Sequence, residues 1–270
     1  MKKRLISAAV GSAVGVVVLS FSNLLVLEIT GALLTAVAIY EIFKTAGLRS
    51  HRLLMCIAWL FGAVIIFTAR GSLRISVLYP AVLFFASVIV TAVLRFGKVN
   101  PESLMTVALF CAYITAGMYS LVYVRGHSHG LFLLVMVLCS AWLTDAGAYF
   151  VGSAFGKHKI APELSPKKTV EGAVGGILTT LILGLAATYI YTRFVNQIGV
   201  NYLLLAVTLA VSAVVSMFGD LFASSLKRWY KVKDYGNIMP GHGGVLDRFD
   251  SVLAVAPLFA VALNQFSFIM

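Results

Sequence analysis

The chain has 270 residues, of which 60% are hydrophobic and only 11% charged, and its mean hydropathy is +0.97. This composition excludes an ordinary soluble protein and is typical of polytopic membrane proteins. The formal net charge of +11 does not indicate nucleic-acid binding, because aromatic residues are spread through the apolar stretches and are not interleaved with a basic patch.

Nine apolar stretches are long enough to cross a hydrocarbon core of about 30 Å as helices, at about 1.5 Å per residue. They predict an all-α integral membrane bundle of about nine transmembrane helices. The expected spans are Leu5 to Phe21, Leu24 to Phe43, Leu53 to Ala69, Ile75 to Leu94, Leu104 to Val124, Leu131 to Val151, Val170 to Thr192, Tyr202 to Phe222 and Phe249 to Phe266. The first resembles a signal sequence, but it is long and another span follows at once, so we interpret it as an uncleaved anchor.

The distribution of Lys and Arg predicts the orientation in the membrane. If all nine stretches cross, every Lys and Arg faces the N-terminal side except Arg70, Arg74, Arg125 and Arg193. By the positive-inside rule the N-terminus is then cytoplasmic and the C-terminus lies outside. We expect a multi-pass protein of the plasma (inner) membrane.

Acidic residues divide the chain near residue 130. Glu28, Glu41 and Glu102 precede this point, and we interpret Glu28 and Glu41, near the two ends of the second span, as hydrated. In the expected topology the other acidic residues lie in cytoplasmic loops or at the cytoplasmic ends of spans: Asp145, Glu163, Glu171, Asp220, Asp234, Asp247 and Asp250. We therefore predict that residues 1–130 form a lipid-facing scaffold and residues 131–270 a catalytic half with two cytoplasmic polar loops.

The seventh span is rich in glycine, which predicts close helix packing in a compact bundle. The glycines concerned are Gly172, Gly175, Gly176 and Gly184. The sequence shows no convincing internal repeat, which weakens the case for a secondary transporter.

A hydrophilic run from Ser224 to Asp250 separates the last two spans, and Asp220 and Asp247 lie near the ends of those spans. A carboxylate at the end of a span needs a compensating partner. Mg²⁺ prefers carboxylate oxygens, usually takes one or two from the protein, and completes its shell with phosphate oxygens and water. We predict that Asp220 and Asp247 hold a metal. The alternative is that Asp220 pairs with a nearby Lys or Arg.

Other residues of this run suit phosphate groups. Glycines beside His242 allow backbone N–H groups to approach an anion closely, and basic side chains add positive charge. These residues are Lys227, Arg228, Lys231, Lys233, His242, Gly243, Gly244 and Arg248. A solvated cluster in contact with lipid head groups would explain the cations, but not the ordered acids and glycines.

A second polar stretch runs from Asp145 to Gly172. Asp145 lies in an otherwise apolar span and requires a partner such as a cation or a nucleotide group. Lys167 and Lys168 add charge, and Ser165 or Thr169 can cap the next helix, whose N-terminal dipole favours a phosphate. The alternative is a capped helix preceded by lysines that only set topology.

The hydrophilic run resembles the signature of the CDP-diacylglycerol synthases, also called phosphatidate cytidylyltransferases. The resemblance rests on Ser224, Leu226, Lys227, Arg228, Lys233, Asp234, Gly236, Pro240, His242, Gly243, Gly244, Val245, Asp247, Arg248, Phe249 and Asp250. Met239 departs conservatively from the pattern. The upstream polar loop is also similar, through Ser165, Pro166, Lys167, Thr169, Glu171 and Gly172. The resemblance covers about residues 131 to 260 and is only hydropathic before that.

The resemblance implies transfer from CTP to phosphatidic acid, giving CDP-diacylglycerol and pyrophosphate at the cytoplasmic surface. It implies Mg²⁺, room for a second cation, contact with membrane lipids, and a homodimer. Asp220, Asp247, Lys227 and Arg228 are the expected catalytic residues. Asp220, Asp247, Asp145 and Asp250 are the expected metal ligands. Substrate binding is expected from Lys167, Lys168, Thr169, Lys233, Asp234, His242, Gly243, Gly244 and Arg248.

Two alternatives stay open. A CTP-dependent polyprenol or phytol kinase would use similar spans and cations, but it needs a base that activates an alcohol. An ion-coupled transporter predicts functional charges at mid-span or on both faces, whereas here they gather on one.

Overall fold

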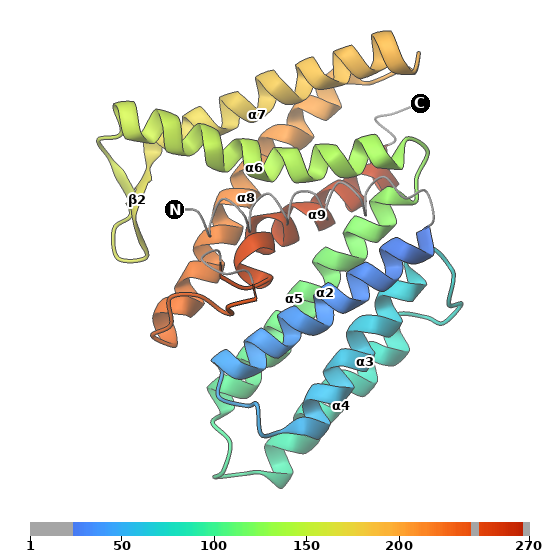
Figure 1. The fold of residues 1–270 in the computed structure, drawn as a ribbon, viewed down its shortest axis with the longest axis vertical. Coiled ribbons are helices and arrows are strands. Elements are labelled where there is room, and N and C mark those ends of the chain that lie inside the picture. Colours follow the sequence, from blue (N-terminus) through green and yellow to red (C-terminus); the bar gives the residue numbers. More distant parts are fainter. Residues whose placement is uncertain (1–23, 239–242, 267–270) are drawn as a thin grey trace. The chain divides into compact units, whose positions relative to one another are not determined.

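The computed structural model describes residues 24–238 and 243–266, and this part is largely helical (Figure 1). The all-α class is confirmed, with one short hairpin that the sequence did not predict. The helices are α2 (Leu24–Thr45), α3 (Arg52–Thr68), α4 (Leu78–Leu94), α5 (Pro101–Arg125), α6 (Gly130–Phe155), α7 (Val170–Ile190), α8 (Tyr202–Trp229) and α9 (Leu246–Phe266). A π-helical turn, Tyr191–Val195, continues α7, and the antiparallel strands β1 (Lys159–Ala161) and β2 (Ser165–Thr169) form the hairpin. The first expected span, Leu5 to Phe21, lies outside the described residues.

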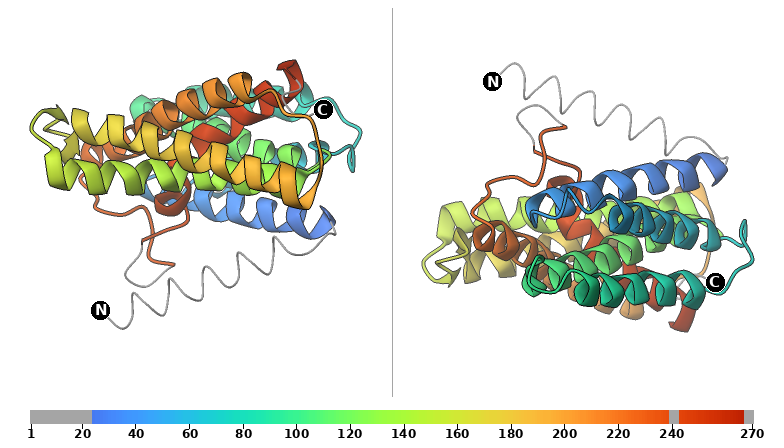
Figure 2. Two further views of the ribbon diagram at one scale, coloured as in Figure 1. Left: turned by 90° about the horizontal axis from the view of Figure 1, so that it is seen from above. Right: turned by 90° about the horizontal axis from the view of Figure 1, so that it is seen from below.

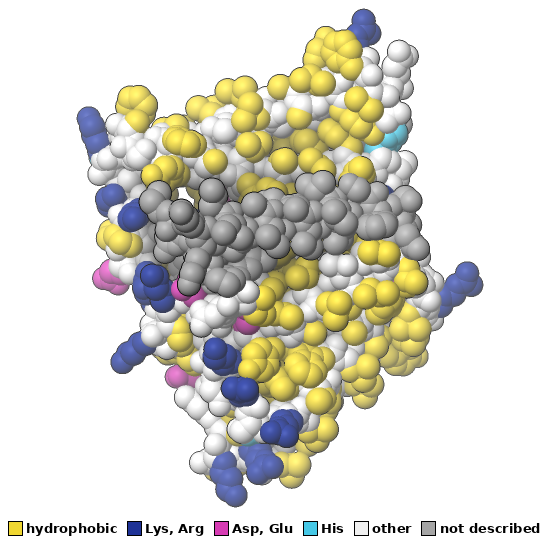
Figure 3. All heavy atoms as spheres, in the orientation of Figure 1, with side chains coloured by type: hydrophobic (Ala, Val, Ile, Leu, Met, Phe, Trp, Pro, Cys, Tyr) yellow, Lys and Arg dark blue, Asp and Glu magenta, His cyan; other side chains and the backbone are white. Residues whose placement is uncertain are grey.

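Five of the described helices are long and apolar enough to cross a membrane: α2, α5, α6, α7 with its π-helical turn, and α8. The helices α3 and α4 are apolar but have only 17 residues each. Many large apolar side chains are exposed, as on α4, where only Pro80 and Phe84 are buried, and Figure 3 shows broad apolar areas on the face it presents. These features fit a polytopic membrane protein, while the expected nine crossings and their orientation stay predictions.

Two helix boundaries near the hydrophilic run differ from the expected ones. The helix α8 continues past Phe222 to Trp229, so Lys227 and Arg228 lie on its last turn. Residues 223–229 contain no glycine or proline, and basic side chains at a helix C-terminus interact favourably with its dipole. The helix α9 begins at Leu246 instead of Phe249, which places Asp247 in its first turn, where the dipole favours an acid.

The chain divides into two compact units, and each is described by itself. The first unit comprises Met1–Gly126 and Trp229–Phe249, and the second His127–Arg228 and Asp250–Met270. The segment that follows α8 therefore belongs with the N-terminal helices. The functional division into a scaffold of residues 1–130 and a catalytic half stays a prediction.

The first unit has an apolar core between α2, α3 and α5. Phe43, Ile66 and Ile114 are fully buried in it. The helix α4 contributes Phe84, whose ring stacks on that of Phe61 at a centroid distance of 4.6 Å. Burial of such rings away from water stabilises the packing of these helices. Where the rings would otherwise face lipid, this contribution is smaller.

In the second unit, α6 and α7 lie side by side, as Figures 1 and 2 both show. Three glycines of α7 touch α6. A Cβ atom at Gly172 would meet the Ala148 carbonyl oxygen at 2.6 Å, and one at Gly176 would meet the Thr144 carbonyl oxygen at 2.7 Å; one at Gly175 would collide with Val151.

The fourth glycine of α7 faces another helix. A Cβ atom at Gly184 would meet Leu209 of α8 at 2.8 Å. The expected close packing through all four glycines is therefore confirmed.

We predict that Gly176→Leu forces α6 and α7 apart, because the backbone of α6 occupies the space that the new side chain needs. Overpacking of this kind costs about 1 to 3 kcal/mol. The expected result is a melting temperature in detergent several degrees below that of the unaltered protein. Val174→Leu, on an exposed position of the same helix, is the matched control. Equal melting temperatures for the two variants would contradict the packing described here.

Candidate active site

Three aspartates from different helices of the second unit interact electrostatically. They are Asp145 of α6, Asp220 of α8 and Asp250 of α9, and we call them the aspartate cluster. The negative charge of Asp220 acts on both Asp145 and Asp250, and that of Asp145 acts on Asp250. Asp250 is only 9% exposed. Because like charges in a poorly solvated place repel each other, the cluster is suited to a cation.

A close contact between two helices contributes to this arrangement. Gly219 precedes Asp220 on α8, and a Cβ atom there would meet the Ala254 Cβ of α9 at 2.6 Å and the Asp250 carbonyl oxygen at 3.1 Å. Only a residue without a side chain allows α8 and α9 to approach so closely. Asp220 and Asp250 therefore flank the point where the two helices touch.

The hairpin brings a lysine to the aspartate cluster. The Lys168 Nζ atom of β2 donates to the Asp220 Oδ2 atom at 2.6 Å and to the Met217 carbonyl oxygen at 3.2 Å. This is the Lys pairing that the sequence left open as the alternative for Asp220. The positive charge of Lys227 also acts on Asp250. Two lysines therefore act on three carboxylates.

Ser251 joins two members of the aspartate cluster, and sequence reasoning missed it. Its hydroxyl donates to the Asp145 Oδ2 atom at 3.3 Å, and its backbone N–H donates to the Asp250 Oδ1 atom at 2.8 Å. The only signal in the sequence was its place directly after Asp250. A serine beside a carboxylate at a helix start is too common to be singled out on that basis.

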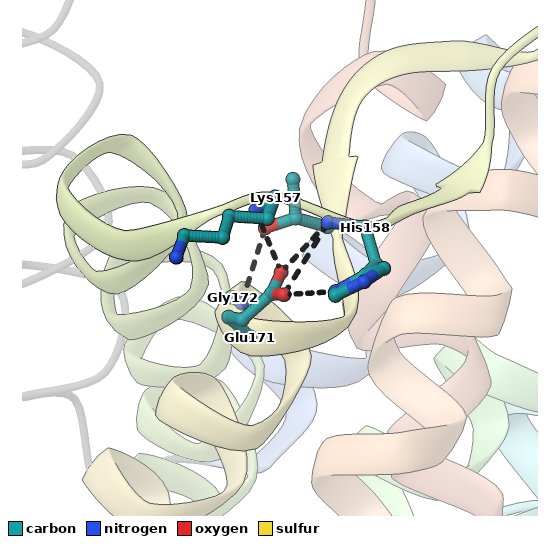
Figure 4. A network of polar contacts seen from close by, with 5 residues as sticks. Lys157, His158, Glu171 and Gly172 are labelled. Atoms are coloured by element: carbon teal, nitrogen blue, oxygen red, sulfur yellow. Dashed lines mark hydrogen bonds and ion pairs between the residues drawn. The ribbon is translucent and has the colours of Figure 1, made fainter.

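Polar contacts at the start of α7 anchor the hairpin (Figure 4). Glu171 accepts hydrogen bonds from the backbone N–H groups of Lys157 and His158, at 3.0 and 3.2 Å, and contacts the His158 Nδ1 atom at 2.6 Å. The Thr169 hydroxyl accepts from the Gly172 N–H at 3.1 Å, so the expected helix cap is confirmed. These contacts fix the open end of the hairpin, where β1 begins and β2, which carries Lys168, ends.

In the first unit, Asp247 organises the loop before α9. Its Oδ2 atom accepts from the backbone N–H groups of Tyr235, at 2.8 Å, and Gly244, at 2.9 Å. Gly243 has a φ of +85°, which glycine adopts at little cost, and a Cβ atom there would meet the Asp247 Oδ2 atom at 2.8 Å. The Gly244 N–H group therefore binds Asp247, and the approach of this backbone to a phosphate stays a prediction.

Glu41 of α2 contacts the same loop, which contradicts its interpretation as a hydrated side chain. It is 2% exposed and accepts from the backbone N–H groups of Val245, at 3.0 Å, and Leu246, at 2.9 Å. Glu28 is not hydrated either, because it is 1% exposed and accepts from the Ser72 hydroxyl at 2.9 Å. The cost of an unpaired acid in a span is a signal that could have flagged both residues, although not their partners.

The remaining predicted residues have varied surroundings. Lys167 is exposed beside Lys168, and Arg228 is exposed at the end of α8. Lys233, Asp234 and Arg248 are exposed in the first unit, and His242 lies outside the described residues.

The expected pair of metal ligands is divided between the two units. Asp220 lies in the second and Asp247 in the first, so their joint metal site stays a prediction. Within residues 24–238 and 243–266, no group of three or more His, Cys, Asp or Glu side chains is placed to hold a metal by itself. Mg²⁺ usually takes fewer protein ligands than that and adds phosphate oxygens and water.

Comparison with known proteins places this chain in a family. The model of a family described as "Cytidylyltransferase family" matches residues 2–266. A phosphatidate cytidylyltransferase of Bacillus subtilis is 37% identical over 243 residues, which are 86% of this chain and 86% of the relative. One of Staphylococcus aureus is 43% identical over 162 residues, 58% of this chain and 60% of the relative. One of Haemophilus influenzae is 45% identical over 141 residues, 51% of this chain and 48% of the relative.

The family match extends over both units and includes the aspartate cluster, the hairpin and the loop before α9. The alignment with the Bacillus subtilis relative likewise covers most of this chain and most of the relative. The protein therefore belongs to the cytidylyltransferase family.

Proposed function

We propose that the protein is a phosphatidate cytidylyltransferase, which makes CDP-diacylglycerol and pyrophosphate from CTP and phosphatidic acid. Family membership and the names of its relatives support this function. The structural observation that carries it is the aspartate cluster with Lys168 bound to Asp220. Carboxylates suit metal ions and lysines suit phosphates, and a reaction between two polyanions needs both.

The reaction makes modest demands on proton transfer. An oxygen of the phosphatidic acid phosphate attacks the α-phosphorus of CTP, and the bond from that phosphorus to the oxygen bridging to the β-phosphate breaks. Pyrophosphate leaves with the bridging oxygen. Because the attacking phosphate is already ionised, no strong base is needed, and catalysis consists of alignment and charge stabilisation.

The residues of the aspartate cluster fit a hard divalent cation by their chemistry. Their three carboxylates act on one another through their charges, and oxygen is the ligand that Mg²⁺ prefers. One or two of Asp220, Asp145 and Asp250 would hold the ion, with phosphate oxygens and water completing its shell, and Asp247 stays a predicted ligand. A bound Mg²⁺ would neutralise charge on the phosphate oxygens of the substrates. Four acidic residues leave room for a second cation.

We assign the basic residues to phosphate binding, beginning with Lys168. Lys168 binds Asp220, and its exposed neighbour Lys167 lies on the same strand. The Lys168 ammonium would bind the triphosphate by turning from Asp220 to the phosphate oxygens. Lys227, Arg228, Lys233 and Arg248 are further phosphate ligands in this proposal, with Thr169, Asp234, His242, Gly243 and Gly244 as substrate contacts.

The apolar helices support a location of this reaction at the membrane. The five candidate spans among the described residues carry exposed apolar side chains, which would provide a surface for the acyl chains of the lipid substrate and product. CTP arrives from the cytoplasm, which is the side that the positive-inside rule gives for the polar loops. We therefore propose a plasma-membrane enzyme with its active site facing the cytoplasm. We also propose that the protein is a homodimer, and this proposal is supported by the family resemblance alone.

Position-specific labelling of CTP tests the reaction. With purified protein, phosphatidic acid and Mg²⁺, label at the α-phosphorus should enter the lipid fraction, and label at the γ-phosphorus should appear in pyrophosphate. Transfer of the γ-phosphorus to an added polyprenol or phytol would instead identify a lipid kinase. Ion flux through liposomes without turnover of CTP would identify a transporter.

Removing single carboxylates tests the metal ligands. Asp220→Asn, Asp145→Asn and Asp250→Asn should each lower Mg²⁺-dependent turnover by at least about 100-fold, because an amide replaces an anionic ligand. Glu163→Gln, on an exposed residue between the two strands, is the control and should retain activity. Chelation should abolish turnover by the unaltered protein, and added Mg²⁺ should restore it. An aspartate whose variant keeps normal activity and Mg²⁺ dependence is not a ligand.

Replacing Lys168 tests its exchange between Asp220 and the nucleotide. Lys168→Met should raise the KM for CTP by about tenfold, the ratio that corresponds to the loss of one charge-assisted contact. Lys168→Arg should retain much of the affinity, and Lys159→Met, on the exposed neighbouring strand, is the matched control. If Lys168→Met leaves the KM for CTP unchanged, the lysine only pairs with Asp220.

A further inference from the structure

The start of α9 is held by a carboxylate from the N-terminal helices. Glu41 lies on α2, and its two oxygens accept from the N–H groups of Val245 and Leu246, which are 204 and 205 residues away in sequence. The first N–H groups of a helix have no partner within the helix, and the helix dipole favours a negative charge there. Glu41 therefore caps α9 from outside its own segment.

The loop before α9 is shaped to admit this carboxylate. Gly236 and Gly244 both approach Glu41 so closely that a Cβ atom on either would collide with its Oε1 atom. Both glycines are buried, as is Glu41 itself. No larger residue fits at either position while Glu41 keeps its place. The backbone of the loop thus lies against Glu41 on both sides of residues 237–243.

A second carboxylate closes the same loop. Asp247 accepts from the N–H groups of Tyr235 and Gly244 through a single oxygen. The two ends of the loop, at residues 235–236 and 243–246, are therefore gathered around Glu41 and Asp247. Of the two, only Glu41 comes from an element distant in sequence. It ties the N-terminal helices to a loop for which substrate contacts are proposed.

We infer that Glu41 is a positioning residue for substrate binding, because it fixes the loop that carries Gly243 and Gly244 and that leads into the first turn of α9, where Arg248 lies. This inference rests on the proposed function. A buried carboxylate is costly unless donors compensate it, so the arrangement is stable only while the loop stays closed on Glu41. The N-terminal helices would then set the geometry of the phosphate-binding backbone, beyond serving as a lipid-facing scaffold.

Glu28 offers a matched control on the same helix. It is as buried as Glu41, at 1% against 2% exposure, but it accepts from Ser72 and makes no described contact with the loop. Glu28→Gln and Glu41→Gln therefore make the same chemical change in the same helix. A difference between the two variants reports on the loop and not on the loss of a buried charge in general.

The first readout is hydrogen exchange of the Val245 and Leu246 amides in the full-length protein. Glu41→Gln should speed their exchange by about tenfold or more, the ratio expected from losing a hydrogen bond to a charged acceptor. Glu28→Gln should leave it unchanged. This measurement needs no substrate, so it stands whether or not the protein turns over CTP.

The second readout is steady-state turnover with CTP, phosphatidic acid and Mg²⁺. Glu41→Gln should lower kcat/KM by roughly 10- to 100-fold, mainly through the KM for CTP, with an unchanged Mg²⁺ requirement. If Glu41→Gln does not fold, Gly244→Ala tests the contact between Glu41 and the loop from the other side. It should also speed amide exchange at Val245 and Leu246 and lower kcat/KM. The double variant Glu41→Ala with Gly244→Ala should lose less kcat/KM than the two single losses predict together, because both changes act on one contact.

The outcomes separate this inference from the proposed function. If the unaltered protein turns over CTP, but Glu41→Gln matches Glu28→Gln in exchange and kinetics, the inference is overturned and the function stands. Faster exchange with normal kinetics also overturns it, since the contact is then only structural. If the unaltered protein shows no transfer from CTP, the proposed function fails, and the catalytic part of the inference fails with it.

Discussion

Acidic side chains placed in an apolar chain must be given hydrogen-bond donors or cations, and the polar features of this protein follow from that constraint. Glu41 meets it with two backbone amides, and Asp220 with a lysine. Asp145 accepts from Ser251, and the charges of nearby lysines act on Asp145 and Asp250. The mutual repulsion of Asp145, Asp220 and Asp250 is what makes the second unit suited to a cation.

The two kinds of carboxylate have different consequences. Those that accept from backbone amides, Glu41 and Asp247, hold a loop in shape. Those that repel one another, in the aspartate cluster, store negative charge that a metal can use. The proposed reaction between CTP and a phospholipid would use both, since it would need a loop of fixed shape beside the substrates and a cation for their charge. Each kind of carboxylate is found in a separate compact unit.

Hydropathy alone predicted the described helices, because length and apolar content suffice to recognise them. It ended α8 at Phe222 instead of Trp229 and began α9 at Phe249 instead of Leu246, because charged residues there were taken as loop although they favour helix termini. The hairpin was missed because its strands have three and five residues and no apolar alternation. The partners of Glu41 and Asp145 come from segments more than 100 residues away, and no local pattern indicates which they are.

The glycine contacts between α6 and α7 limit how the site can move. Backbone lies against backbone there, and Glu171 and Thr169 tie the hairpin to the start of α7, so neither helix can slide without steric collision. A change of partner by Lys168 must then come from rotation about its own side-chain bonds. Such a rotation leaves α6 and α7 in place, so the proposed capture of the nucleotide by this lysine would need no movement of the helix pair.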